Sequence, residues 1–255
     1  MAAEQAELFA RVAELRTLWR SQPAAKAAAP SAAQRVAEAA PVRKRQERTV
    51  LLGAGCNNHC RNCVGEHGRY ETAVERLKLS VARAAEGSGR VVLAGREPTL
   101  VPGLTALIRH ARRSGASAVE LLSNGRMLAA PGNPRRLVRA GLTDLLLKRH
   151  RLADDHEDAI TGAAGSGAQM WQAAIRLSNE APGIGWSMLI VPVAEGLAEL
   201  PALVDRAARL GAQAVRIQVL AAELELDRAS TWRVAIEAAR SRATAHGLRC
   251  AVEGF

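Results

Sequence analysis

Short apolar runs alternate with helical runs along most of the chain, and this alternation limits the possible folds more than any other feature. The apolar runs have the length of buried strands, and the runs between them carry apolar residues at helical spacing. Strands that alternate with helices build a parallel sheet, because each crossover helix returns the chain to the same end of the sheet. We therefore expect an α/β protein, a partial or full (β/α) barrel of about six parallel strand–helix units.

The pattern also gives approximate bounds for each element. The expected strands are Thr49–Leu52, Val91–Ala94, Ala118–Leu122, Leu142–Lys148, Trp186–Val191, Ala214–Val219 and Leu248–Val252. The expected helices are Tyr70–Glu86, Leu100–Ser114, Pro134–Ala140, Met170–Glu180, Leu197–Leu210 and Ser230–His246. In such barrels the functional groups lie at the carboxyl ends of the strands.

The first 48 residues differ from the rest of the chain. Ala2–Arg20 has helical spacing, and a proline-punctuated, Ala-rich segment follows it and ends in the basic residues Arg43, Lys44, Arg45 and Arg48. We expect a helical extension and basic linker over residues 1–48, and one barrel domain over residues 49–255. The extension could cover the barrel, dock a partner or a peptide substrate, or have no specific role.

The charge balance is basic, with 35 Lys and Arg against 25 Asp and Glu, a formal net charge of +10. Arginine supplies most of this charge and alanine is abundant, which indicates codon bias and weakens a functional reading. Aromatic residues make up only 3% of the chain, whereas a base-stacking surface for nucleic acid needs more. No apolar stretch approaches the ~20 residues of a membrane span, and no signal peptide is recognisable. We expect a cytoplasmic protein with neither a nucleic-acid nor a membrane partner.

Three of the four cysteines form a tight cluster, Cys56-x3-Cys60-x2-Cys63, in a glycine-flanked loop after the first expected strand. Three thiolates can hold three irons of a 4Fe–4S cluster, and because the usual complement is four cysteines, one iron stays open for a ligand. The alternative is a zinc site, for which Cys250, His59 or His67 would have to supply a fourth ligand.

This cysteine spacing resembles the signature of the radical S-adenosylmethionine (radical SAM) superfamily. Gly95-Arg96-Glu97-Pro98, after the second strand, is similar to the Gly-Gly-Glu-Pro motif of that family, and Ser123-Asn124-Gly125 is similar to its Thr-Asn-Gly. Asp158–Gly162 resembles a stretch found in members that modify peptides or small metabolites. The likeness runs in order from Thr49 to Leu220. Asn62, Arg96 and Lys148 depart from the usual residues, and no Cys-rich carboxyl-terminal extension for auxiliary clusters is present.

The resemblance implies a cofactor pair and a set of contacts. Cys56, Cys60 and Cys63 would hold one 4Fe–4S cluster, and the implied S-adenosylmethionine (SAM) contacts are Asn62, Gly95, Arg96, Glu97, Pro98, Ser123, Asn124 and Lys148. Lys148 and His150 are possible contacts to SAM or substrate. Arg61, Arg96, Lys148 and Arg149 are candidates for tuning the cluster or binding the SAM carboxylate. Two simpler readings stay open, in which Glu97 only caps a helix and Asn124 only forms a turn.

The implied activity is reductive cleavage of SAM to a 5′-deoxyadenosyl radical, which abstracts hydrogen from a substrate. The substrate is a peptide, a protein or a small metabolite, and an electron donor such as flavodoxin or ferredoxin is required. The cofactor supplies the chemistry, while the protein orients it and excludes competing reactions. The alternative function is a non-catalytic zinc- or iron–sulfur-binding regulatory protein.

Overall fold

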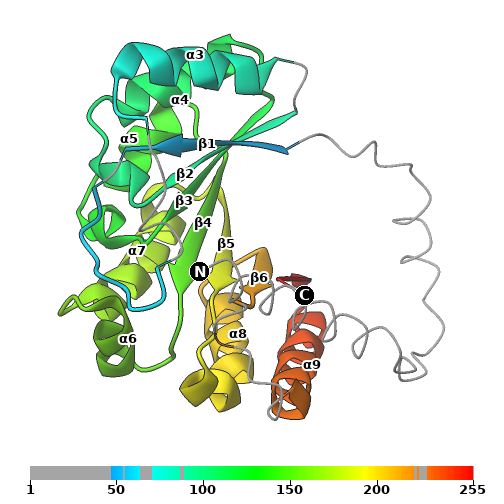
Figure 1. Ribbon diagram of the computed structural model, residues 1–255. Coiled ribbons are helices and arrows are strands. Elements are labelled where there is room, and N and C mark those ends of the chain that lie inside the picture. The colour runs from blue at the N-terminus through cyan, green and yellow to red at the C-terminus, as the bar shows by residue number, and fades with distance from the viewer. Residues whose placement is uncertain are drawn as a thin grey trace, which may run out of the picture.

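The computed structural model describes residues 47–254, apart from 54, 64–70, 87–88, 221–222 and 224–228. Seven parallel strands form one sheet, in which each strand pairs with the next along the chain (Figure 1). The strands are β1 (Glu47–Leu52), β2 (Arg90–Gly95), β3 (Ala118–Ser123), β4 (Asp144–Arg149), β5 (Gly185–Ile190), β6 (Ala214–Gln218) and β7 (Arg249–Glu253).

Helices connect the strands and follow one another around the outside of the curved sheet (Figure 1). They are α3 (Val74–Ala85), α4 (Leu104–Arg113), α5 (Asn133–Arg139), α6 (Asp154–Thr161), α7 (Ser166–Glu180), α8 (Leu200–Arg209) and α9 (Ala229–Ala245). Short 3-10 turns open three of the connections, η1 (Pro98–Leu100), η2 (Arg126–Ala129) and η3 (Ala194–Glu199). None of the described helices is long and apolar enough to cross a membrane.

The strand order is that of a barrel that does not close. Within the described ranges, β1 pairs only with β2, apart from an isolated bridge between Leu52 and Glu71, and β7 pairs only with β6. The expected α/β architecture is therefore confirmed in its partial form, with seven strands. Among the described residues this partial barrel leaves a lateral opening, and Leu51 on β1 is 46% exposed although it lines the inner side.

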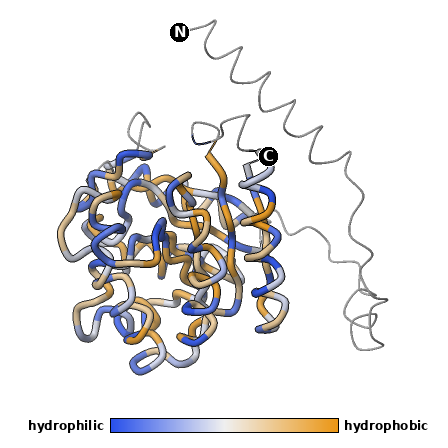
Figure 2. Tube along the Cα trace, turned by 90° about the horizontal axis from the view of Figure 1, so that it is seen from below, coloured by the Kyte–Doolittle hydropathy of each residue, from blue (hydrophilic) through white to orange (hydrophobic). Residues whose placement is uncertain are grey.

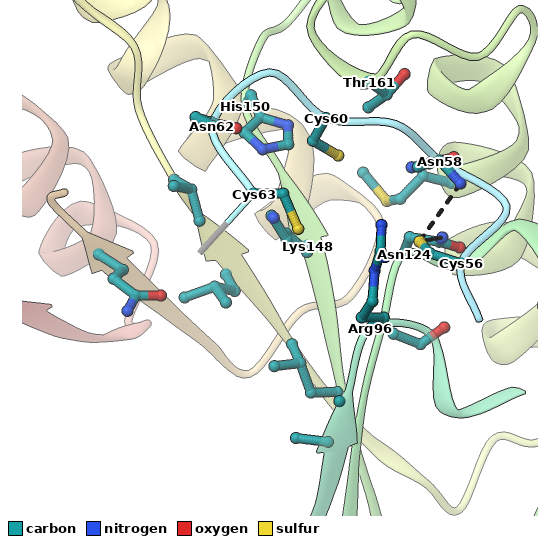
Figure 3. Close-up of a pocket in the computed structure, with 18 of the residues that line it drawn as sticks. Cys56, Asn58, Cys60, Asn62, Cys63, Arg96, Asn124, Lys148, His150 and Thr161 are labelled. Atoms are coloured by element: carbon teal, nitrogen blue, oxygen red, sulfur yellow. Dashed lines mark hydrogen bonds between the residues drawn. The ribbon is translucent and has the colours of Figure 1, made fainter. Parts of the chain in front are cut away.

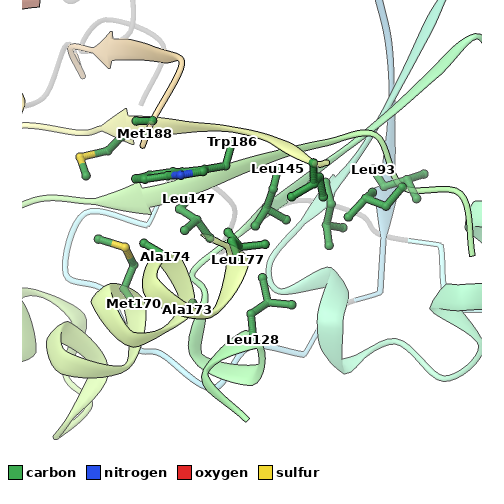
Figure 4. Packing of buried hydrophobic residues seen from close by; sticks show 14 of the residues in the cluster. Leu93, Leu128, Leu145, Leu147, Met170, Ala173, Ala174, Leu177, Trp186 and Met188 are labelled. Carbon is green, nitrogen blue, oxygen red and sulfur yellow. The ribbon is translucent and has the colours of Figure 1, made fainter. Parts of the chain in front are cut away.

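Each strand alternates between the helix layer and the inside of the barrel, so that two apolar clusters form. The larger lies between sheet and helices, where Leu147 and Trp186 pack against α7 residues such as Leu177 (Figure 4). The smaller lies inside and contains Leu146, Leu189 and Val191. Burial of one such leucine contributes about 2 kcal/mol. Hydrophobic segments gather towards the middle of the molecule in Figure 2.

Charged side chains fill the inside of the barrel towards the amino ends of the strands. Glu120 is buried, and its Oε2 accepts hydrogen bonds from Arg90 at 2.8 Å and Arg216 at 3.1 Å. Arg90 also lies 3.2 Å from Asp144. This network joins β2, β3, β4 and β6 at one end of the barrel.

Several predicted bounds differ from the structure. Helix α6 was not expected, and α4 begins only at Leu104 because η1 and Gly103, with φ of 80°, precede it. Strand β1 begins at Glu47, so that the last two residues of the expected 1–48 extension belong to the sheet. The rest of that extension lies outside the described residues, as does His67.

Candidate active site

The cysteine loop (residues 55–63) follows β1 and lies over the carboxyl ends of the strands (Figure 3). Between this loop and the strand ends is a cavity of about 410 Å³. Of the predicted cluster ligands and SAM or substrate contacts, all except Glu97 and Pro98 line it, namely Cys56, Cys60, Asn62, Cys63, Gly95, Arg96, Ser123, Asn124, Lys148 and His150. The remaining wall is mostly apolar and includes Leu51, Leu122, Leu189, Val191 and Leu220.

Helix α6 holds one arm of the cysteine loop. The backbone N–H of His59 donates to the carbonyl of Thr161 at 2.7 Å, and that of Arg61 donates to Ile160 at 3.0 Å. The last carbonyls of a helix have no partner within the helix, so they are free to accept these bonds. Gly162, with φ of 59°, ends α6 at this point. The Asp158–Gly162 stretch therefore docks the cysteine loop.

The three cysteines are half-buried thiols in the same cavity. Burial raises the pKa of the Cys56 thiol, and a hydrogen bond from the Asn58 backbone N–H at 3.4 Å opposes the rise. Burial also raises the pKa of the Cys60 thiol, and the Lys148 charge opposes it. Among the described residues no three His, Cys, Asp or Glu side chains form a site for one metal ion. Three thiolates that each bind a different iron need not meet at one point.

Glu97 does not face the cavity. It is 1% exposed, and its Oε1 accepts hydrogen bonds from the Thr99 N–H at 3.0 Å, from the Thr99 hydroxyl and from the Ser123 hydroxyl at 2.9 Å. Its Oε2 accepts from the Asn124 N–H at 2.8 Å. Burial raises the pKa of the carboxyl, and these bonds oppose the rise. Glu97 thus caps η1, as one reading expected, and joins the ends of β2 and β3.

The neighbours of Glu97 have different roles. Gly95 adopts φ of 140°, and a Cβ there would lie 2.3 Å from the Leu52 carbonyl oxygen, so close strand pairing requires glycine. Pro98 is buried at the start of η1. Arg96 lines the cavity, and its buried Nε has no hydrogen-bond partner within the described ranges. Of this motif, only Gly95 and Arg96 line the cavity.

On the far side of the cavity, β4 supplies Lys148 and, just past its end, His150 (Figure 3). His150 is 1% exposed, and its Nε2 has no hydrogen-bond partner among the described residues. Its Nδ1 lies 2.9 Å from Oε1 of Glu157, a buried residue of α6. Burial lowers the pKa of His150, although Glu157 opposes this. An ionised carboxylate only accepts, so Nδ1 carries the proton and Nε2 is an acceptor.

Glu157 was missed at the level of sequence. Burial raises the pKa of its carboxyl, but the hydrogen bond and charge of His150, the charge of Arg149 and the Arg151 N–H lower it more, leaving the pKa below its ordinary value. Its signal is an acidic residue seven positions after His150 in the first turn of a helix, which becomes visible only once α6 is recognised. Asn62, in turn, lines the cavity, and both its side-chain polar atoms are buried without a hydrogen-bond partner in the part of the chain that the structure describes.

Two of the predicted cationic residues are directed elsewhere. Arg149 is fully buried in the helix layer, where it contacts Asp154 at 2.8 Å and lies 4.4 Å from the ring centroid of Trp171. Arg61 pairs at 2.7 Å with Glu195 at the surface. Neither lines the cavity, which argues against direct contact with the SAM carboxylate, whereas an effect of their charge on the cluster stays a prediction. Adjacent residues of a strand point to opposite faces, and Arg149 therefore points away from Lys148.

Solved structures share this fold. SuiB of Streptococcus suis, bound to S-adenosylmethionine, matches with a TM-score of 0.66 over 82% of this chain and 50% of SuiB, at 14% identity. In its complex with the precursor peptide SuiA, SuiB matches with a TM-score of 0.65 at 14% identity, over 97% of this chain and 62% of SuiB. The matched part of the chain thus covers between 50% and 62% of the SuiB length.

Two other proteins are also similar. anSMEcpe with bound AdoMet and Kp18Cys peptide matches with a TM-score of 0.63 over 81% of this chain and 64% of that chain, at 14% identity. TYW1 with a lysine-pyruvate adduct bound matches with a TM-score of 0.52 over 76% of this chain and 70% of that chain, at 14% identity. No protein-family model and no curated protein matches the sequence. The expected partial barrel is therefore established as the fold.

Proposed function

We propose that this chain is a radical SAM enzyme that binds one 4Fe–4S cluster through Cys56, Cys60 and Cys63. The observation that carries the proposal is that all three thiols line a single cavity at the carboxyl ends of parallel strands. The fold of SuiB and anSMEcpe, which were solved with S-adenosylmethionine, supports it. When bound, cluster and SAM supply the one-electron chemistry that gives a 5′-deoxyadenosyl radical for hydrogen abstraction from a substrate.

The donor set of the cavity fits this pair of cofactors. Thiolates are the ligands that iron–sulfur clusters require. Arg96 and Lys148 both line the cavity with their cationic side chains. Both are therefore available for the negative charge of the SAM carboxylate and of a reduced cluster. Asn62 offers a buried amide whose two polar atoms have no hydrogen-bond partner among the residues that the structure describes.

Other residues act by holding these groups in place. Glu97 orients the β3 end through its bonds to Ser123 and Asn124, and we assign it to positioning rather than to ligand contact. His150 presents Nε2 as an acceptor for a hydroxyl or N–H of SAM or substrate. The apolar wall of the cavity limits water and side reactions around a reactive intermediate.

A peptide is the substrate that we favour. SuiB was solved with a precursor peptide and anSMEcpe with the Kp18Cys peptide. The lateral opening of the partial barrel beside Leu51 gives a chain access to the inner side. A small metabolite is the alternative. The reaction also needs an electron donor such as flavodoxin or ferredoxin. We expect this protein and its electron donor to meet in the cytoplasm.

Reduced protein with and without SAM tests the proposal against the regulatory alternative. The protein is reconstituted anaerobically with iron and sulfide, reduced with dithionite and examined by electron paramagnetic resonance. We expect a 4Fe–4S signal that SAM perturbs, and Cys60→Ala should lose the signal while Cys250→Ala keeps it. A stable zinc complex without a cluster would favour the non-catalytic metal-binding protein.

A further inference from the structure

Arg126, in η2, reaches across to the cysteine loop. Its Nη1 donates to the carbonyl oxygen of Asn57 and, at 3.1 Å, to Oδ1 of Asn58. Its Nε donates to Oε1 of Gln169 on α7 at 2.7 Å. One guanidinium therefore joins the loop, η2 and α7.

The base of this side chain is itself fixed. The backbone N–H of Arg126 donates to Oδ1 of Asn124 at 3.0 Å, and Nδ2 of Asn124 donates to Oδ1 of Asn57 at 2.7 Å. Two residues away, Leu128 is buried against α7 (Figure 4). Asn57 thus receives two hydrogen bonds from a segment that the core holds rigid.

The two arms of the cysteine loop have different anchors. The arm with Cys60 is bonded to the end of α6, as described above. The arm with Cys56 is bonded through its two following residues to Arg126 and Asn124. Because the Asn58 N–H donates to the Cys56 sulfur at 3.4 Å, the position of the 57–58 segment also sets the direction of that thiol.

We propose that Arg126 is a positioning residue that fixes the Cys56 arm of the loop and directs the Cys56 thiol before any cofactor binds. The effect of Arg126 on cluster retention rests on the proposed function, whereas its effect on the Cys56 thiol does not. A planar guanidinium suits this role because its donors lie in a rigid fork, which lysine cannot reproduce.

Site-resolved alkylation of the full chain without cofactors tests the proposal. Under reducing, anaerobic conditions the protein is treated with iodoacetamide, and the rate at each cysteine is read by mass spectrometry. We expect iodoacetamide to alkylate Cys56 several-fold faster in the Arg126→Met variant than in the wild type, because the Cys56 thiol becomes more accessible. Cys250, on β7, is the internal reference and should react at an unchanged rate. Arg126→Lys should be intermediate.

Arg176→Met is the matched control. Arg176 also links α7 to η2, through Nε to the Ala129 carbonyl at 2.5 Å, but it makes no hydrogen bond to the cysteine loop. The Arg176→Met variant should leave the alkylation rate of Cys56 unchanged. If Arg126→Met fails to fold, Gln169→Leu takes its place, because it removes the hydrogen bond that Arg126 Nε donates to Gln169. It should raise the alkylation rate of Cys56 to a smaller extent. An unchanged Cys56 rate in folded protein, or an equal rise at Cys250, would overturn the proposal.

A second readout concerns the loaded protein. After reconstitution, a ferrous chelator should remove iron several-fold faster from Arg126→Met than from Arg176→Met. If no variant, including the wild type, takes up a cluster, the proposed function fails while the alkylation result still decides the role of Arg126. If both variants lose iron equally fast, Arg126 has no specific part in holding the site.

Discussion

Glu157 holds the imidazole of His150 in one tautomer, with Oε1 2.9 Å from Nδ1. The other carboxylate oxygen accepts the backbone N–H groups of His150 at 2.9 Å and Arg151 at 2.7 Å. The carboxylate cannot rotate without losing these bonds. As a result the unpartnered Nε2 of His150 is kept as an acceptor in the cavity.

Glu157→Gln should release this constraint. A glutamine side chain can accept fewer hydrogen bonds from the three donors, which are the backbone N–H groups of His150 and Arg151 and the His150 Nδ1. We therefore expect the free energy of unfolding to fall by about 2 kcal/mol. In ¹⁵N spectra of the imidazole, the protonated fraction of Nε2 should rise. Unchanged ¹⁵N shifts in a folded variant would show that Glu157 does not set the tautomer.

The pair also predicts how stability depends on pH. Burial lowers the pKa of His150 in the folded protein, so the unfolded chain binds a proton that the folded chain resists. Its contribution is present above about pH 6.5 and is lost as pH falls through the lower folded pKa. The contribution of His150 to the free energy of unfolding should therefore decrease as the pH falls below about 6.5. His150→Gln should remove this contribution and leave a shallower slope than the wild type shows in that range. Equal slopes in the two proteins would refute the prediction.

Glu97→Ala distinguishes positioning from ligand contact. It leaves the N–H groups of Thr99 and Asn124 and the Ser123 hydroxyl without their acceptor. We expect a loss of about 3 kcal/mol in urea unfolding, together with weaker SAM binding by the reconstituted protein. Thr99→Val, which removes only one hydroxyl donor, should cost about 1 kcal/mol. If Glu97→Ala kept full stability and lost only SAM affinity, Glu97 would be a direct ligand contact.

Gly95→Ala should disrupt the pairing of β1 and β2. The new Cβ would lie 2.3 Å from the Leu52 carbonyl oxygen at a backbone φ of 140°. We expect a loss of about 3 kcal/mol or more in thermal or urea unfolding. Gly103→Ala is the control, since its φ of 80° is strained but no atom lies within 4 Å, and it should cost about 1 kcal/mol. Equal losses would mean that the close approach of the strands is not limiting.

The barrel was predictable because its strands carry strong signals. Parallel strands covered by helices on one side and an apolar cavity wall on the other appear as apolar runs such as Val91–Ala94. Helix α6 was not predictable from periodicity, because its inward residues include Glu157 and Thr161 rather than an apolar stripe. Its residues are buried through polar bonds that only the folded chain forms.

The motifs at strand ends correctly located the cavity, because parallel strands bring their carboxyl ends to one edge. What each side chain does there depends on tertiary contacts. The Ser123 hydroxyl donates a hydrogen bond to Glu97. Arg126 donates one to the cysteine loop, although no motif includes Arg126. The orientation of Arg149 was within reach of the sequence, since it shares the parity of the helix-facing Leu145 and Leu147.

The most direct test of the central claim is the formation of 5′-deoxyadenosine. Reconstituted protein is reduced with dithionite under anaerobic conditions, SAM is added, and the product is quantified by mass spectrometry. The proposed activity requires 5′-deoxyadenosine and methionine in equal amounts from the wild type and none from Cys60→Ala. Protein that carries a reduced cluster and binds SAM but leaves it intact, or a Cys60→Ala variant that cleaves SAM as fast as the wild type, would contradict it.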